Sequence, residues 1–436
     1  MSITTNQSRA RILTLAFGAT TAMWFLAYCS FLFASKIGGE ILFLLSAFFL
    51  FQVARYSTSK VEGFLIGFTS ATINLMLIGS IIGGQSSKEM LMTGILWVAG
   101  LYVFSCAIGI LGAMCRGVVI DGHKVIDWRF AFSSVASMLV FLMLVSGGLV
   151  TGLEAGLAVP DWPNSYGHNM LLYPLSEMVS SDDSGVFFEH AHRLTGMFVG
   201  LTSLVLLACI LKWSQSIKVR IMVIVLFSLV CVQGLLGGLR VTGFLTMSQD
   251  PSVLMPNIWL GVVHGVLAQC IFTLFVWLSS LMSNAWQFPT QLTSKKDRFF
   301  AHLLCAAMLL QLILGALYRH MLGDEVLAAK TSHLLYTHIA LAFGILVLGI
   351  IVGIRFIDLD HLVFKRLGTI LLSFISLQLL LGGGALIAIM IQKGETIPVY
   401  EVLITTAHQA NGALLLATSV MCFVWSVRFK SKGTPS

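Results

Sequence analysis

Residues 367–391 read LGTILLSFISLQLLLGGGALIAIMI, a stretch without a single charged side chain. A helix needs about 20 apolar residues to cross a bilayer, so this stretch predicts a membrane span. Eleven similar apolar runs lie at about 12–34, 38–54, 62–83, 90–114, 130–151, 188–211, 219–240, 258–282, 300–321, 333–354 and 403–427. Together they predict an all-α polytopic membrane protein with about twelve transmembrane helices.

The composition and the placement of the basic residues support this prediction. Of the 436 residues 57% are hydrophobic and 10% charged, whereas about 25% of a soluble domain is charged. If the N-terminus is cytoplasmic, 19 of the 26 Lys and Arg residues fall in cytoplasmic segments, as expected for a membrane protein. We predict the bacterial inner (plasma) membrane, with both termini cytoplasmic and lipid around the spans. The basic residues form no patch, so the net charge of +7 predicts no nucleic-acid partner.

Histidines and repeated glycine segments divide the chain. All eleven histidines lie from His123 onward, so chemistry is expected in the last eight spans. LVSGGLVTG (144–152) resembles LILGALYRH (312–320), and VQGLLGGLRV (232–241) resembles LQLLLGGGAL (377–386). Small residues allow close helix packing, and we predict two pseudo-symmetric four-helix bundles. The predicted domains are an N-terminal four-helix region (1–115), a cytoplasmic linker (116–129), a first bundle (130–285) with an ordered outside loop (152–187), a second bundle (299–427) and a cytoplasmic tail (428–436).

Four histidines occupy equivalent positions near the outer ends of their spans, and they are His192, His264, His338 and His408. The first two are 72 residues apart and the last two 70, whereas His333 in place of His338 would give 75. Ionisable groups inside a membrane are costly and indicate function. Imidazole suits iron, and haem iron takes axial protein ligands. We predict that the four histidines ligate two haem irons near the outer face. Hydrogen-bonding histidines or a proton path are the alternatives.

The first histidine pair has charged neighbours that the second lacks. Glu189 precedes His192 by three residues, so the two share one helical face. A carboxylate there can relay protons, which predicts a catalytic role. The alternative is an ion pair with Arg193, which we also predict to contact the cofactor. Arg240 and Arg319 stand at the outer ends of their spans and are predicted to pair with haem propionates, a topology signal or lipid contact being the alternative.

The region 130–427 resembles the haem A synthases of cytochrome oxidase assembly. The segments that carry the resemblance are GGLVTGLEAGLAVPDWP (147–163), EHAHRLTG (189–196), GLLGGLRVTG (234–243), His264 and HQANGALLL (408–416). The resemblance implies two similar four-helix bundles. It also implies that haem O, bound by the first histidine pair beside Glu189, is oxidised at a methyl group to the formyl group of haem A. The second pair would hold a permanent haem b.

Two features depart from that family. The loop 152–187 has no cysteine pair, so the chain resembles the cysteine-lacking type. The region 1–115 has no counterpart in the common eight-helix form, and the resemblance suggests the haem O-producing farnesyltransferase or cytochrome oxidase subunits as its partners. The electron donor is left open, as is a homo-oligomer. The alternative functions are a membrane b-type cytochrome that passes electrons from quinol to a partner, and a haem transporter or chaperone.

Overall fold

The computed structural model describes most of the chain. The described residues are 3–33, 39–77, 88–115, 126–174, 177–178, 181, 184–214, 216–242, 258–287, 293–321, 331–391 and 397–428. His123, most of the predicted linker and the predicted tail after residue 428 lie outside them.

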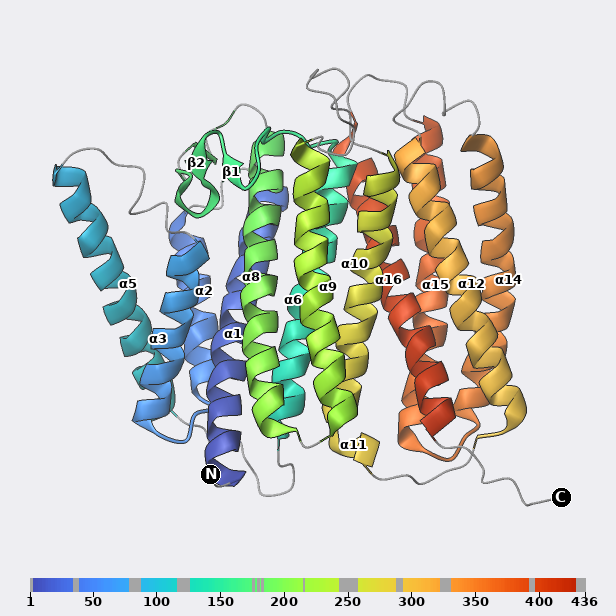
Figure 1. Ribbon diagram of the computed structural model, residues 1–436, viewed down its shortest axis with the longest axis horizontal. Coiled ribbons are helices and arrows are strands. Elements are labelled where there is room, and N and C mark those ends of the chain that lie inside the picture. Colours follow the sequence, from blue (N-terminus) through green and yellow to red (C-terminus); the bar gives the residue numbers. More distant parts are fainter. Residues whose placement is uncertain are drawn as a thin grey trace. The chain divides into compact units, whose positions relative to one another are not determined.

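Helices dominate the described residues (Figure 1). The helices that match the predicted spans are α1 (Ile3–Phe33), α2 (Gly39–Ala54), α3 (Lys60–Leu77), α5 (Lys88–Met114), α6 (Trp128–Gly152), α8 (Ser184–Trp213), α9 (Ile217–Thr242), α10 (Ile258–Met282), α12 (Lys295–Met321), α14 (Thr331–Ile357), α15 (Leu362–Ile391) and α16 (Val399–Arg428). Ten of these are long and apolar enough to cross a membrane; α2 is apolar but shorter, and α3 is not among the ten. The predicted all-α membrane fold is confirmed.

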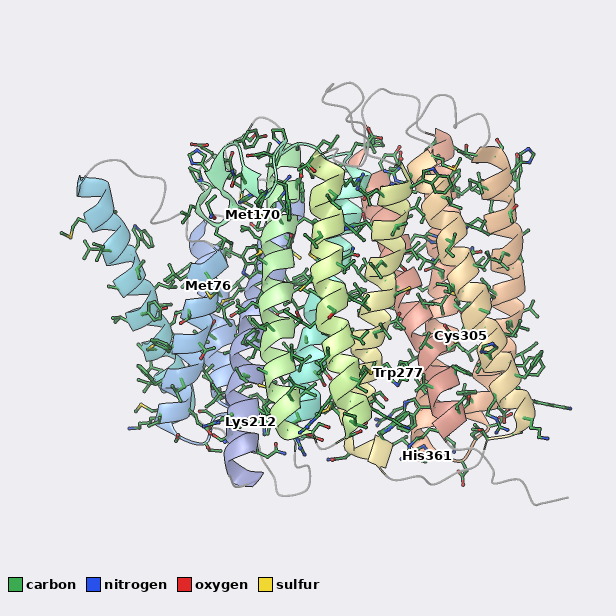
Figure 2. The ribbon with its side chains drawn as sticks, viewed as in Figure 1. Met76, Met170, Lys212, Trp277, Cys305 and His361 are labelled. Atoms are coloured by element: carbon green, nitrogen blue, oxygen red, sulfur yellow. The ribbon has the colours of Figure 1, made fainter. Side chains whose placement is uncertain are left out.

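The remaining elements are short. The helix α11 (Asn284–Gln287) follows α10. Strands β1 (Asn164–Ser165) and β2 (His168–Asn169) pair antiparallel and lead into the short helix η1 (Met170–Leu172), whose first residue is labelled in Figure 2. The hairpin turns at Tyr166 and Gly167, which have φ values of 49° and 78°. Positive φ at both central residues suits a two-residue hairpin, since its twist matches that of the strands.

The chain divides into two compact units. Unit 1 comprises Met1–Met143 and Val159–Phe227, and unit 2 comprises Leu144–Ala158 and Ser228–Ser436. Helices α6 and α9 therefore contribute residues to both units. The predicted domain boundaries, which follow the duplicated sequence pattern, stay predictions.

In unit 1, α1 packs against helices α3, α6 and α8. Its Phe17 ring lies 5.5 Å from Phe132 of α6 and 6.0 Å from Phe198 of α8, measured between ring centroids. Arg11 of α1 forms a salt bridge of 2.6 Å with the buried Glu62 of α3. The predicted N-terminal region thus shares an apolar core with the helix that carries Glu189.

In unit 2, helices α12, α14, α15 and α16 form the second predicted bundle. Helix α12 packs against α14 and α16, and α15 packs against the same two helices, which closes a ring of four. Its core includes the fully buried Phe356, Phe364 and Cys422. Cys305 of α12, labelled in Figure 2, donates from its thiol to the carbonyl of Ser419 at 3.1 Å.

Candidate functional site

Each predicted ligand histidine lies near the N-terminal end of its helix. His192, His264, His338 and His408 stand six to nine residues after the first residue of α8, α10, α14 and α16. Three of these helices begin before the corresponding apolar runs: α8 at Ser184 rather than residue 188, α14 at Thr331 rather than 333, and α16 at Val399 rather than 403. His192 belongs to unit 1 and His264 to unit 2, so their pairing stays a prediction.

The second histidine pair lies within unit 2. The rings of His338 and His408 have centroids 6.4 Å apart and planes inclined by 68°. A metal–imidazole bond of about 2 Å, with about 1 Å from nitrogen to ring centre, would place two opposed ligands about 6 Å apart. The two rings therefore fit a metal held between them. His333, the alternative to His338, is exposed.

Three of these histidines share a partner that sequence reasoning missed. The main-chain carbonyl of each accepts a hydrogen bond from a glutamine on the preceding helix. The pairs are Gln233 and His264 at 2.9 Å, Gln311 and His338 at 2.9 Å, and Gln378 and His408 at 3.1 Å. The sequence pattern that could have indicated these partners is a glutamine four positions before a glycine, which occurs in three separate apolar runs.

That glycine makes room for the imidazole. It lies one helical turn after each glutamine and therefore on the same face. A Cβ atom there would stand close to the Cε1 atom of the histidine ring. The distances are 3.2 Å for Gly237 and His264, 3.0 Å for Gly315 and His338, and 3.0 Å for Gly382 and His408. Each ring thus lies directly against the backbone of the neighbouring helix, where a larger residue would displace it.

Buried polar atoms at these sites fit a role as ligands. In the described residues, Nδ1 of His264 and Nδ1 of His338 are buried without a hydrogen-bond partner, as are the side-chain oxygens of Gln233 and Gln311. Buried polar groups are normally satisfied. A histidine that binds a metal through one nitrogen donates from the other to an outer partner. These atoms and the glycine-lined space therefore fit a haem iron ligated by the histidines.

Glu189 and Arg193 hold the loop that precedes α8. The Glu189 carboxylate lies 2.5 Å from the Arg193 guanidinium and accepts a bond of 2.7 Å from the Val159 main-chain N–H. Arg193 also donates to the carbonyls of Val159, Asp161 and Asn164 at 2.7, 2.6 and 3.1 Å. The ion pair considered as the alternative is thus present. The catalytic role of Glu189 and the cofactor contact of Arg193 stay predictions.

The same loop is ordered by further contacts, as the sequence predicts for its described part. The Asp161 carboxylate accepts from the main-chain N–H groups of Tyr166 and Gly167 at 2.7 and 2.8 Å. His190 is buried; its Nδ1 lies 3.1 Å from the Ser165 hydroxyl and its ring 4.9 Å from that of Tyr173. Burial raises the pKa of Tyr173, an effect to which the nearby carboxylate of Glu177 adds.

Both predicted propionate-binding arginines lie beside the segment 144–158 of unit 2. Arg319 donates to the carbonyl of Thr151 at 2.8 Å. The guanidinium of Arg240 lies 3.5 Å from the place where a Cβ atom at Gly156 would stand. His320 packs against Gly261 of α10, one turn before His264. Two positively charged side chains therefore lie beside one segment of unit 2, which suits an anionic ligand.

Comparison with known proteins identifies the family. Residues 130–420 match the COX15-CtaA family, described as a cytochrome oxidase assembly protein. The chain belongs to this family. Family membership and the ten apolar helices together make it an integral membrane protein.

Three curated relatives named heme A synthase are similar to this chain. The proteins of Rickettsia massiliae, Beijerinckia indica and Pelagibacter ubique are 24%, 29% and 28% identical to it. The similarity covers 39%, 42% and 41% of this chain, and 48%, 55% and 56% of the relatives. The chain thus spans about half the length of the curated relatives it matches.

Proposed function

We propose that the protein is a haem A synthase, a membrane oxidoreductase that oxidises a methyl group of haem O to the formyl group of haem A through successive hydroxylations, with the oxygen supplied from water or from dioxygen. The observation that carries this proposal is the neighbouring pair His338 and His408, whose ring centroids lie 6.4 Å apart, within a region that matches the cytochrome oxidase assembly family. The names of the three relatives support the same reaction.

The four histidines divide between substrate and cofactor in this proposal. His192 and His264 bind haem O, and His338 and His408 bind a resident haem b that passes electrons. The glycine-lined rings and the buried Nδ1 atoms of His264 and His338 support ligation. Arg240 and Arg319 receive propionates, because both are cationic and lie beside the same segment of unit 2.

Glu189 is the proposed catalytic residue of the substrate site. A carboxylate beside the haem can relay protons during the hydroxylation of the methyl group. Its position in α8, three residues before His192, places it on the same helical face as the ligand. Arg193 and the Val159 N–H fix the carboxylate in place, and the Glu189 side chain is buried.

The placement in the cell follows from the charge pattern. We propose an inner-membrane protein with cytoplasmic termini and with haem sites near the outer face, because 19 of the 26 basic residues then lie inside. The haem O-producing farnesyltransferase and subunits of cytochrome oxidase are the proposed partners, since the first makes the substrate and the second uses the product.

The test is extraction of the haems from the purified protein, separated by chromatography and identified by mass. We expect haem b together with haem O, its hydroxymethyl derivative or haem A. Haem b alone, from cells that make haem O, would favour an electron-transfer cytochrome. Well-folded protein without haem would refute the assignment of all four ligands.

A further inference from the structure

Three helices of unit 2 repeat one arrangement around a histidine. In each, a glutamine donates to the carbonyl of the histidine residue on the next helix, and a glycine four residues later lies against the ring of the same histidine. Hydrogen bonds between helices fix their relative height and rotation in a membrane, where the hydrophobic effect does not. The repeat therefore controls both the depth and the orientation of each imidazole.

The glutamine amide also lies close to the ring itself. At His408, the Nε2 atom of Gln378 is 3.2 Å from Nδ1, while its Oε1 atom accepts from Asn411 at 2.7 Å. At His338, the Oε1 atom of Gln311 and the ring Nδ1 atom are both buried and without partners in the described residues. A ligand imidazole carries its proton on Nδ1 when Nε2 binds the metal, and that proton needs an acceptor. In the structure the Gln311 oxygen and the His338 Nδ1 atom are not hydrogen-bonded to each other, so the contact that holds His338 is the bond from the Gln311 amide N–H to its main-chain carbonyl.

One position in α6 resembles this arrangement but has methionine in place of glutamine. Met143 lies four residues before Gly147 in α6, as Gln311 lies four residues before Gly315 in α12. The Met143 methyl group is 3.3 Å from a Cβ placed at Gly196, four residues after His192. Gln378 lies at the same 3.3 Å from a Cβ placed at Gly412, four residues after His408. Methionine therefore fits the space of the glutamine, but its thioether has no N–H to donate.

We propose that Gln233, Gln311 and Gln378 are positioning residues for the histidines that ligate haem. Each holds its ligand residue by donating a hydrogen bond to the main-chain carbonyl of the histidine. The proposal rests on the proposed haem ligation. It predicts that these amides set haem retention and reduction potential without contacting the substrate.

Gln311→Met is the decisive variant, since the chain itself uses methionine at the equivalent place in α6. Purified full-length protein is reconstituted in nanodiscs, and loss of haem to excess apomyoglobin is followed by absorbance. Outer partners of metal ligands typically change metal affinity about 10- to 100-fold. We therefore expect haem to leave the second site about 10- to 100-fold faster than from the parent protein. The midpoint potential of that haem should also shift, because His338 loses the hydrogen bond that fixes its main chain and is free to change its orientation.

Gln269→Met is the matched control. Gln269 is also a buried glutamine in a span, but no glycine follows it four residues later. Its variant should keep the parent rate and potential. Unchanged haem loss and potential in Gln311→Met would overturn the inference, as would equal changes in both variants. Parent protein without haem would instead refute the proposed function, so the two failures can be told apart.

Discussion

Replacing Glu189 by alanine would remove the two carboxylate oxygens, one of which accepts from the Val159 N–H of the loop and the other from the Arg193 guanidinium of α8. The side chains of Glu189 and Arg193 are only 4% and 7% exposed, so the arginine charge would stay buried without its counter-ion. Removing one partner of a buried ion pair costs about 3–5 kcal/mol. At about 1.4 kcal/mol per tenfold, opening of the loop should become roughly 100- to several thousand-fold more frequent.

The assay is hydrogen exchange followed by mass spectrometry, read on the peptides that cover residues 159–174. Peptides of α14 serve as the internal reference and should exchange as in the parent protein. Glu189→Gln keeps one acceptor and loses the other, so its cost should be about 1.5–3 kcal/mol, the value of one hydrogen bond to a charged group. The double variant Glu189→Ala with Arg193→Ala removes both members of the ion pair and leaves no uncompensated charge. It should therefore cost less than the two single substitutions together.

If hydrogen exchange in residues 159–174 rises less than tenfold in Glu189→Ala, the predicted cost of leaving Arg193 unpaired is wrong. Strict additivity in the double variant would refute it as well, because independent residues add. The experiment also separates the two roles of Glu189. If Glu189→Gln keeps the loop closed and accumulates haem O, the carboxylate acts in the chemistry. If activity falls only in variants whose loop opens, the residue is a structural clamp.

Three further outcomes follow from individual contacts. Gly382→Ala should displace the His408 ring at a cost of about 1–3 kcal/mol, seen as altered haem absorbance. Gly383→Ala should leave the absorbance unchanged, since nothing lies within 4 Å of a Cβ placed there. Glu62→Ala breaks the buried pair with Arg11 and should lower the melting temperature through a loss of about 3–5 kcal/mol; an unchanged melting curve would argue against this. His408→Met should reduce extracted haem b more than haem O or haem A, and loss of the modified haems alone would mean that the two sites are reversed.

Much of the fold could be predicted because membrane helices are specified locally. Each apolar run contains nearly all the information needed for its own helix, since no water is present to satisfy a different backbone arrangement. The helices begin earlier than the runs where polar residues form the first turn, as in α12, which starts at Lys295 rather than at residue 300. The division into compact units could not be predicted, because it depends on which helices pack together.

The parts of the candidate site that could be predicted are residue types that rarely occur inside membrane spans. A histidine in a span stands out because its burial is costly, and the placement of His338 opposite His408 agrees with the spacing of the repeat. The partners of Arg193 were not predictable, since three of them are backbone carbonyls that every residue provides. Gln311 was missed for a similar reason, because its partner is also a main-chain carbonyl.

The two halves of the repeat differ in where charged residues are used. Glu189 and Arg193 tie α8 to a loop of backbone carbonyls and N–H groups. The equivalent positions in α14, three before and one after His338, hold Leu335 and Ile339, which have no donor or acceptor for such a loop. A buried ion pair gives little net stability, so its presence in one half only argues for a requirement of that site. A site that oxidises the bound haem needs a closed surrounding that relays protons, whereas a site that only passes electrons has no such need. Glutamines hold histidines at both proposed sites, through Gln233 at His264 and through Gln311 and Gln378 at the second pair.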